Sequence, residues 1–217
     1  MSRVFLGVAI CAAIAVAASP AAERGRAYDA QQPSDGRRSV SIDGELMAGA
    51  LFRLARTYGT VVGYENGLGG PETKQLTAQL SNVYLLDAVE SVVKMDPRFA
   101  WRLNPNGTIT VFTKDVRPTL SDVRISHFEA KDHFRKEVSA SLAEVPEVRK
   151  WLSQNRCTRT EWITGNSWRD DNKKITLNLT AKTFREVLDE VAKQSETYVW
   201  SIVQWDSGNG CEISFKL

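Results

Sequence analysis

The sequence predicts an α+β protein made of two tandem small modules of the form β-α-β-β-α-β-β, with helices packed on one face of small mixed sheets. Two observations carry this prediction. One is an internal repeat at an offset of 99 residues, and the other is a regular change between strand and helix periodicity inside each copy. Periodicities of two and 3.6 residues distinguish half-buried strands from amphipathic helices.

The repeat begins with a strand and a helix. Apolar and polar residues alternate over residues 76–80 and again over 175–179, which predicts two half-buried strands. In each copy, apolar residues then recur with helical spacing: Leu85, Ala88, Val89, Val92 and Val93, followed 99 residues later by Phe184, Val187, Leu188, Val191 and Ala192. Thr183 and Glu186 are spaced as a capping box. The opposite, solvent-facing side is predicted to carry Asp87, Glu90 and Lys94, or Glu186, Asp189 and Lys193.

The register of the repeat continues through a second strand and a hairpin. Trp101 and Trp200 occupy equivalent positions and are predicted to be core residues. Asn106-Gly107 supplies the residue types that accept the positive φ angles of a hairpin turn. An inserted residue would reverse the face of a strand, so agreement over strand, helix and strand indicates a real repeat.

The modules are predicted at residues 40–116 and 119–217, with Arg117-Pro118 at their boundary. In the first, residues 40–42 and 60–64 are strand-like and flank a helix. In the second, residues 123–128 and 160–164 are strand-like, and residues 131–152 are helical with an interruption at Pro146. The second module is a diverged copy, since only its latter half follows the repeat.

Residues 1–21 have the pattern of a secretory signal peptide. Arg3 precedes an apolar run and small residues follow it, with cleavage expected after Ala17 or Ala21. The alternative is a retained membrane anchor, although the run is shorter than the roughly 20 residues that a spanning helix needs. Cys11 lies inside the apolar run, where a lipid anchor is not expected. Residues 22–39 are predicted to be a flexible linker, and the mature chain is predicted to be soluble and periplasmic or secreted, without a transmembrane segment.

Cleavage of the signal peptide would leave Cys157 and Cys211. A pair of cysteines in an exported protein predicts a disulfide, while two buried thiols are the alternative. The bond would close a loop of about 54 residues and contribute roughly 4 kcal/mol on the chain-entropy model.

No catalytic, cofactor or metal motif is apparent in the sequence. His127, Glu129 and His133 lie near one another, but they lack a fixed ligand spacing and are expected to be surface residues. The formal charge of +2 is too small to indicate nucleic-acid binding. We therefore expect a protein that is not an enzyme and that binds no cofactor.

The first module resembles the secretin and TonB short N-terminal (STN) domain. The resemblance rests on Val40-Ser41-Ile42, on a helix with Leu46 and Ala50-Leu51-Phe52-Arg53-Leu54-Ala55, and on Leu86-Asp87-Ala88-Val89. It covers residues 40–114 and implies a periplasmic module that docks against other proteins. Asp43-Gly44-Glu45 departs from the apolar, Pro-containing stretch usual in the family. We expect no pore or receptor barrel to follow the two modules, so the resemblance does not imply transport.

Two tryptophans are candidate binding residues. Trp168 is flanked by polar residues, and Trp205 follows a predicted strand and precedes Asp206-Ser207-Gly208. Exposed aromatic residues are enriched at interfaces, although either ring could instead fold back onto its own module. The leading hypothesis is an adaptor that binds envelope or periplasmic proteins. The alternatives are a cell-wall or carbohydrate-binding protein that uses both tryptophans, and an enzyme with a site around His127.

Overall fold

The computed structural model describes residues 36–69, 72–114, 119–160, 173–208 and 210–217. Its elements, in chain order, are β1 (Arg38–Glu45), α2 (Met47–Tyr58), β2 (Val62–Gly69), β3 (Leu76–Val83), α3 (Leu85–Lys94), β4 (Phe99–Leu103), β5 (Ile109–Thr113), η1 (Leu120–Asp122), β6 (Arg124–His133), α4 (Arg135–Glu144), α5 (Pro146–Gln154), β7 (Cys157–Arg159), β8 (Ile175–Thr183), α6 (Phe184–Gln194), β9 (Val199–Asp206) and β10 (Cys211–Lys216). The predicted α+β class is confirmed.

A single six-stranded sheet joins the two modules. Its strand order is β4-β5-β2-β9-β10-β7, so each module supplies three neighbouring strands. In both modules the middle strand, β5 or β10, is antiparallel to one neighbour and parallel to the other. The modules meet where β2 pairs in parallel with β9, from Val62 opposite Val199 to Gly69 opposite Trp205. The sequence predicted a small sheet in each module and gave no sign that the two would share one.

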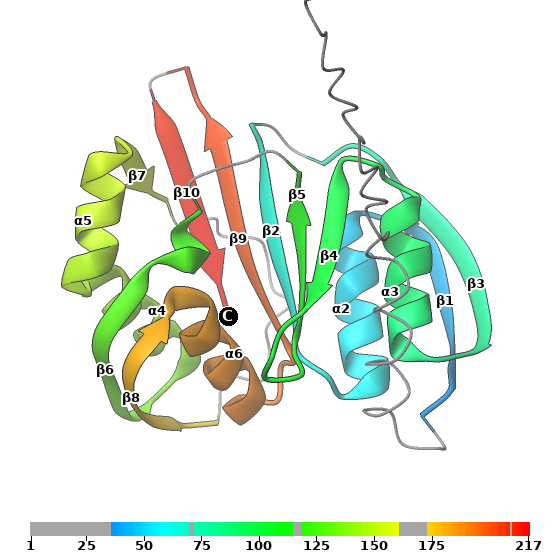
Figure 1. Cartoon of the computed structure of the whole chain (residues 1–217), viewed down its shortest axis with the longest axis horizontal. Coiled ribbons are helices and arrows are strands. Elements are labelled where there is room, and N and C mark those ends of the chain that lie inside the picture. The colour runs from blue at the N-terminus through cyan, green and yellow to red at the C-terminus, as the bar shows by residue number, and fades with distance from the viewer. Residues whose placement is uncertain (1–35, 70–71, 115–118, 161–172, 209) are drawn as a thin grey trace, which may run out of the picture. The chain divides into compact units, whose positions relative to one another are not determined.

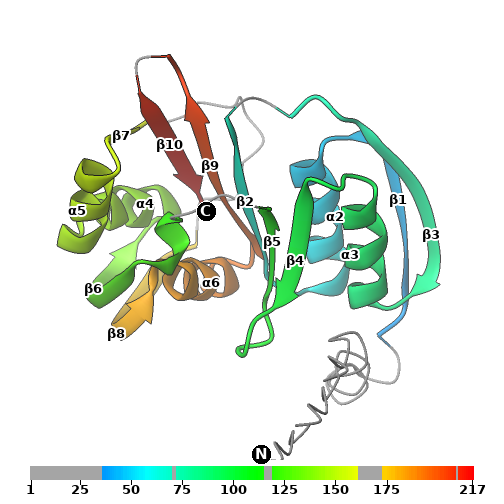
Figure 2. The same cartoon turned by 45° about the horizontal axis from the view of Figure 1, so that its top comes forward.

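Helices cover both faces of the shared sheet (Figures 1 and 2). Helices α2 and α3 of the first module pack on one face, and α4 and α6 of the second pack on the other. Strands β1 and β3 pair on the outer side of α2 and α3, and β6 and β8 do the same beside α4 and α6. The side chains of β2 reflect the two faces: Tyr64 contacts Phe99 of its own module, while the neighbouring Glu65 contacts Arg185 of α6.

The same strand-to-helix corner occurs four times. In each, a residue with a left-handed backbone lies two positions before the helix N-cap: Gly44, Asn82, Asp132 and Ala181, with φ of 61°, 54°, 54° and 53°. At three of the corners, the N–H of that residue donates to a hydroxyl of the paired strand at 3.1 Å, the acceptors being Thr77, Ser39 and Thr176. Gly, Asn and Asp tolerate this backbone, whereas alanine does so at a cost.

The repeat and the cap are as the sequence predicts, and the disulfide is confirmed. Thr183 accepts a hydrogen bond from the N–H of Glu186, and the Glu186 side chain accepts from the N–H of Thr183. Cys157 is bonded to Cys211 and so fastens the three-residue β7 to β10. Pro146 begins α5, which confirms the predicted helix interruption. Residues 36–217 form one compact unit, and β1 begins at Arg38, inside the range predicted as linker.

Candidate functional site

The junction between β2 and β9 depends on a glycine. Gly63 lies opposite Trp200, and a Cβ atom added to Gly63 would lie 2.0 Å from Cζ2 of that indole. No side chain can occupy that space while the ring stays in place. The exposed fraction of Trp200 is 1%, which confirms its predicted place in the core. The junction is therefore closed by an indole that lies over the backbone of the neighbouring strand.

A buried carboxylate fixes this indole from the other side. Asp189 of α6 accepts a hydrogen bond from Nε1 of Trp200 at 2.6 Å. Its second oxygen accepts from Nδ2 of Asn106 at 3.0 Å and from Oγ1 of Thr108 at 2.7 Å, both in the β4–β5 hairpin of the first module. Burial raises the pKa of Asp189 above its usual range, although these three hydrogen bonds act in the opposite direction. Asp189 thus links three segments across the junction.

The burial of Asp189 corrects the prediction that this residue lies on the solvent-facing side of its helix. Its exposed fraction is 0%. The amphipathic pattern predicts a helix with one buried face, but the β4–β5 hairpin of the first module covers a second part of α6. A short-range pattern carries no information about which distant hairpin packs there.

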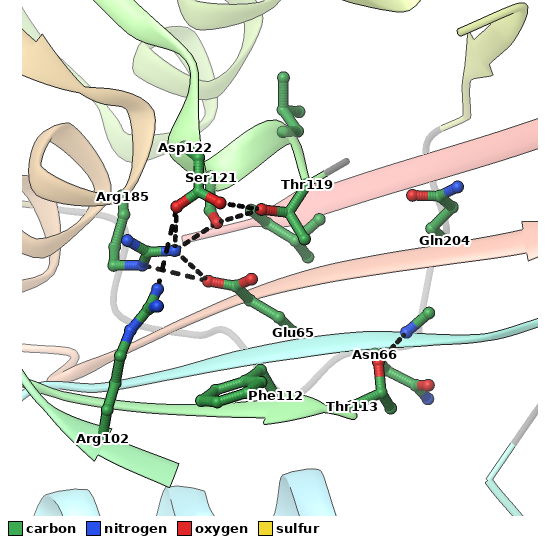
Figure 3. A pocket seen from close by; sticks show the side chains of 13 residues that line it. Glu65, Asn66, Arg102, Phe112, Thr113, Thr119, Ser121, Asp122, Arg185 and Gln204 are labelled. Carbon is green, nitrogen blue, oxygen red and sulfur yellow. Dashed lines mark hydrogen bonds and ion pairs between the residues drawn. The ribbon is translucent and has the colours of Figure 1, made fainter. Parts of the chain in front are cut away.

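A second polar cluster lies nearby and lines a small cleft (Figure 3). The guanidinium of Arg185 donates to Glu65 of β2 at 3.1 Å, to Ser121 at 2.6 Å and to Asp122 at 2.8 Å. Both Arg185 and Glu65 are largely buried, with side-chain exposures of 11% and 8%. Arg102 of β4 reaches the same cleft, and its guanidinium lies 3.9 Å from Asp122. Charges from both modules therefore balance one another here.

The chemistry of this cleft favours a structural role. Its volume is about 80 Å³, well below the roughly 300–1,000 Å³ of sites that hold drug-sized ligands. Burial alone would raise the pKa of Asp122, but hydrogen bonds from Thr119 and Arg185 outweigh it and lower that pKa. Asp122 stays ionised and holds Arg185 in place. The arrangement fastens η1 and α6 to the shared sheet.

The equivalent pair in the first module is more open. Trp101 of β4 donates from Nε1 to Glu90 of α3, as Trp200 does to Asp189 of α6. Trp101 is only half-buried, and the Glu90 side chain is 41% exposed. In the part of the chain that the structure describes, β4 pairs with β5 alone. The prediction that Trp101 is a core residue is therefore correct only in part, because no described strand continues the sheet beyond it.

The candidate binding tryptophans have different outcomes. Trp168 lies outside the described residues. Trp205 lies within β9 rather than after a strand, pairs with Glu212 of β10 and is half-buried. Among the described residues, the exposed large apolar side chains are those of Leu46 and Phe134, which were not predicted to be binding residues. They precede the first helix of each module at equivalent corners.

The hypothesis of an enzyme site around His127 stays a prediction. His127 and Glu129 share an exposed face of β6 with 3.9 Å between Nε2 and Oε2, while Nδ1 of His133 is buried without a hydrogen-bond partner. Within the described ranges, no group of three His, Cys, Asp or Glu side chains is arranged to hold a metal ion.

Among the described residues, no helix is long and apolar enough to cross a membrane.

Comparisons with known proteins give no match: no family model, no curated protein and no solved structure is similar to the chain. The candidate binding site is the edge strand β4 around the half-buried Trp101, because no described strand continues the sheet there. A glycine within an apolar strand was the available sequence signal for the closed junction, because such a glycine often marks a close backbone approach. Nothing in the sequence indicated that β9 would have a strand beside it while β4 would not.

Proposed function

We propose that this chain is an exported protein-interaction module that binds other proteins of the cell envelope. The observation that carries the proposal is the edge strand β4 with its half-buried Trp101. An unprotected edge strand is a template for pairing with another chain, and tryptophan is among the residues enriched in interface hot spots.

Two further features support an envelope location. The disulfide between Cys157 and Cys211 is typical of proteins that fold in an oxidising compartment. The N-terminal segment has the pattern of a secretory signal peptide, with Arg3 before an apolar run. The resemblance of residues 40–114 to the STN domain adds an expectation of docking to other periplasmic proteins.

The test is capture of a partner from the organism's own envelope. The mature chain, tagged at its C-terminus, is cross-linked in cells and recovered, with an unrelated exported protein carrying the same tag as the control. We expect one protein to be recovered in near-stoichiometric amount, and reciprocal tagging of that protein to recover this chain. Repeated recovery of no specific protein would contradict the proposal. Retention on isolated wall material instead would favour the cell-wall alternative.

A further inference from the structure

The closed junction and the open edge are two copies of one structure. At the offset of the repeat, β9 corresponds to β4, Trp200 to Trp101, and Asp189 to Glu90. The indole donates to the helix carboxylate in both copies. In one copy a parallel strand lies beside the indole, and in the other no described strand does.

The backbone of β4 is oriented to accept such a strand. Its ladder with β5 uses the carbonyl of Arg98, which accepts from Lys114 at 2.9 Å, and the N–H of Asn104, which donates to Thr108 at 2.8 Å. Backbone groups alternate between the two sides of a strand. Those of the odd-numbered residues Trp101 and Leu103 therefore point away from β5.

The corresponding groups of β9 already pair with a strand. The carbonyl of Tyr198, which is equivalent to Phe99 in the repeat, accepts from the N–H of Val62 at 2.9 Å. Gly63 and Glu65 of β2 then lie opposite Trp200 and Ile202. Pairing of β2 with β9 thus shows the direction and register that the edge of β4 offers.

The side chain of Trp101 restricts which strand can bind. Nε1 of Trp101 donates to Glu90 as Nε1 of Trp200 donates to Asp189, and from this shared hydrogen bond we expect the ring of Trp101 to lean over the space beside β4. At the closed junction this space accepts only Gly63, since a Cβ atom would overlap the indole. Any residue larger than glycine at the equivalent place would have to displace Trp101.

We propose that β4 binds an extended segment of a partner protein as a parallel strand, with a glycine of that segment opposite Trp101. The segment has the chemistry of β2, in which apolar residues flank the glycine, as in Val62-Gly63-Tyr64. Main-chain hydrogen bonds supply affinity in this mode of recognition, and the glycine supplies specificity. This inference rests on the proposed function and names the kind of segment that is bound.

The test uses a peptide that copies β2, residues 60–67, as a surrogate for the partner segment. The peptide carries a fluorophore at its N-terminus, and fluorescence anisotropy measures its binding to the full mature chain. We expect saturable binding. The same peptide with valine in place of its internal glycine, the one that corresponds to Gly63, is expected to bind at least roughly tenfold more weakly, a loss of about 1.4 kcal/mol.

Two variants of the mature chain locate the binding. L103P removes the N–H that points away from β5, and proline is tolerated at such an edge position. L103A removes the side chain but keeps the N–H. Both variants should keep a cooperative thermal transition. We expect L103P to bind the glycine peptide at least roughly tenfold more weakly than L103A does.

Equal binding of the two peptides, or equal binding by L103P and L103A, would overturn the inference. Sedimentation showing a dimer that L103P disperses would also overturn it, because the occupant would then be a second copy of this chain. Envelope capture separates the two proposals. Recovery of the same partner by wild type and L103P leaves the proposed function standing without this edge, whereas recovery of none contradicts the proposed function itself.

Discussion

The two tryptophan–carboxylate pairs differ in their surroundings more than in their local structure. Trp200 and Asp189 are buried, because β2 and the β4–β5 hairpin of the first module cover them. Trp101 and Glu90 make the same hydrogen bond but remain partly open. A repeated sequence therefore produced the same local arrangement twice, and the parallel addition of one strand turned one copy into core. The effects of matched substitutions on the free energy of unfolding therefore measure what the added strand contributes.

The largest effect is expected at Asp189. The substitution D189A removes the acceptor of three hydrogen bonds and leaves the indole N–H of Trp200 buried without a partner. We expect a loss of about 3 kcal/mol in the free energy of unfolding, measured by denaturant titration. The matched variant E90A should cost less than about 1 kcal/mol, because that carboxylate is partly solvated. Equal losses would show that the covering strand adds nothing to this interaction.

A somewhat smaller effect is expected from adding a single methyl group at the junction. The substitution G63A places a Cβ atom against the ring of Trp200 and should lower the free energy of unfolding by about 2 kcal/mol. Gly49 in α2 is the control, since a Cβ there would meet only the side chain of Glu45, at 3.3 Å. G49A should stabilise the protein by about 0.5–1 kcal/mol through helix propensity. A stabilising G63A would contradict the closed packing.

The strand-to-helix corners provide a third comparison. Ala181 has φ of 53°, in the left-handed region that Gly44 occupies at the corner between β1 and α2. We expect A181G to raise the free energy of unfolding by about 0.5–1 kcal/mol, because the backbone strain of alanine is removed. G44A should lower it by a similar amount. Chemical denaturation of both variants tests the pair, and no change in either would mean that the corners are unstrained.

The smallest expected effect depends on pH and involves Glu72, in the connection between β2 and β3. Burial raises the pKa of Glu72 to about 6, although hydrogen bonding to the N–H of Ala48 opposes the shift. The charges of Asp96 and Arg98 act on it in opposite directions. One carboxylate oxygen is buried without a hydrogen-bond partner.

Because the pKa is higher in the folded protein than the usual 4.5, the stability that Glu72 contributes is complete below pH 4.5 and is lost as the pH rises past 6. At pH 7.5, we expect E72Q to be more stable than wild type by about 1 kcal/mol or less, because partial exposure reduces the effect. The difference should shrink toward pH 4.5 in thermal unfolding followed across this range. A constant difference would show that ionisation of Glu72 is not its cause.

Much of the fold could be predicted from the sequence, because the signals are local. The alternation at residues 76–80 and 175–179 predicts β3 and β8, and the helical spacing that follows predicts α3 and α6. Each of these signals lies within the element that it predicts. The capping box at Thr183 is equally local. The Cys157–Cys211 disulfide could be predicted because removal of the predicted signal peptide leaves a single pair of cysteines. The candidate site could not be predicted in this way, because the residues that flank a tryptophan in the sequence carry no information on which strand lies at the edge of the sheet.

The sequence alone determined that two equivalent units exist and that each carries a tryptophan at the same position of the strand that follows its second helix. Only the tertiary structure decided that β2 would lie beside Trp200, with the indole over Gly63, while Trp101 would remain on an edge strand. The physical reason is that hydrophobic periodicity records which face of a strand is buried, but not which strand lies beside it in the sheet. Edge pairing depends on backbone hydrogen bonds, which every residue can accept and every residue except proline can donate, so its partners leave almost no pattern in the sequence.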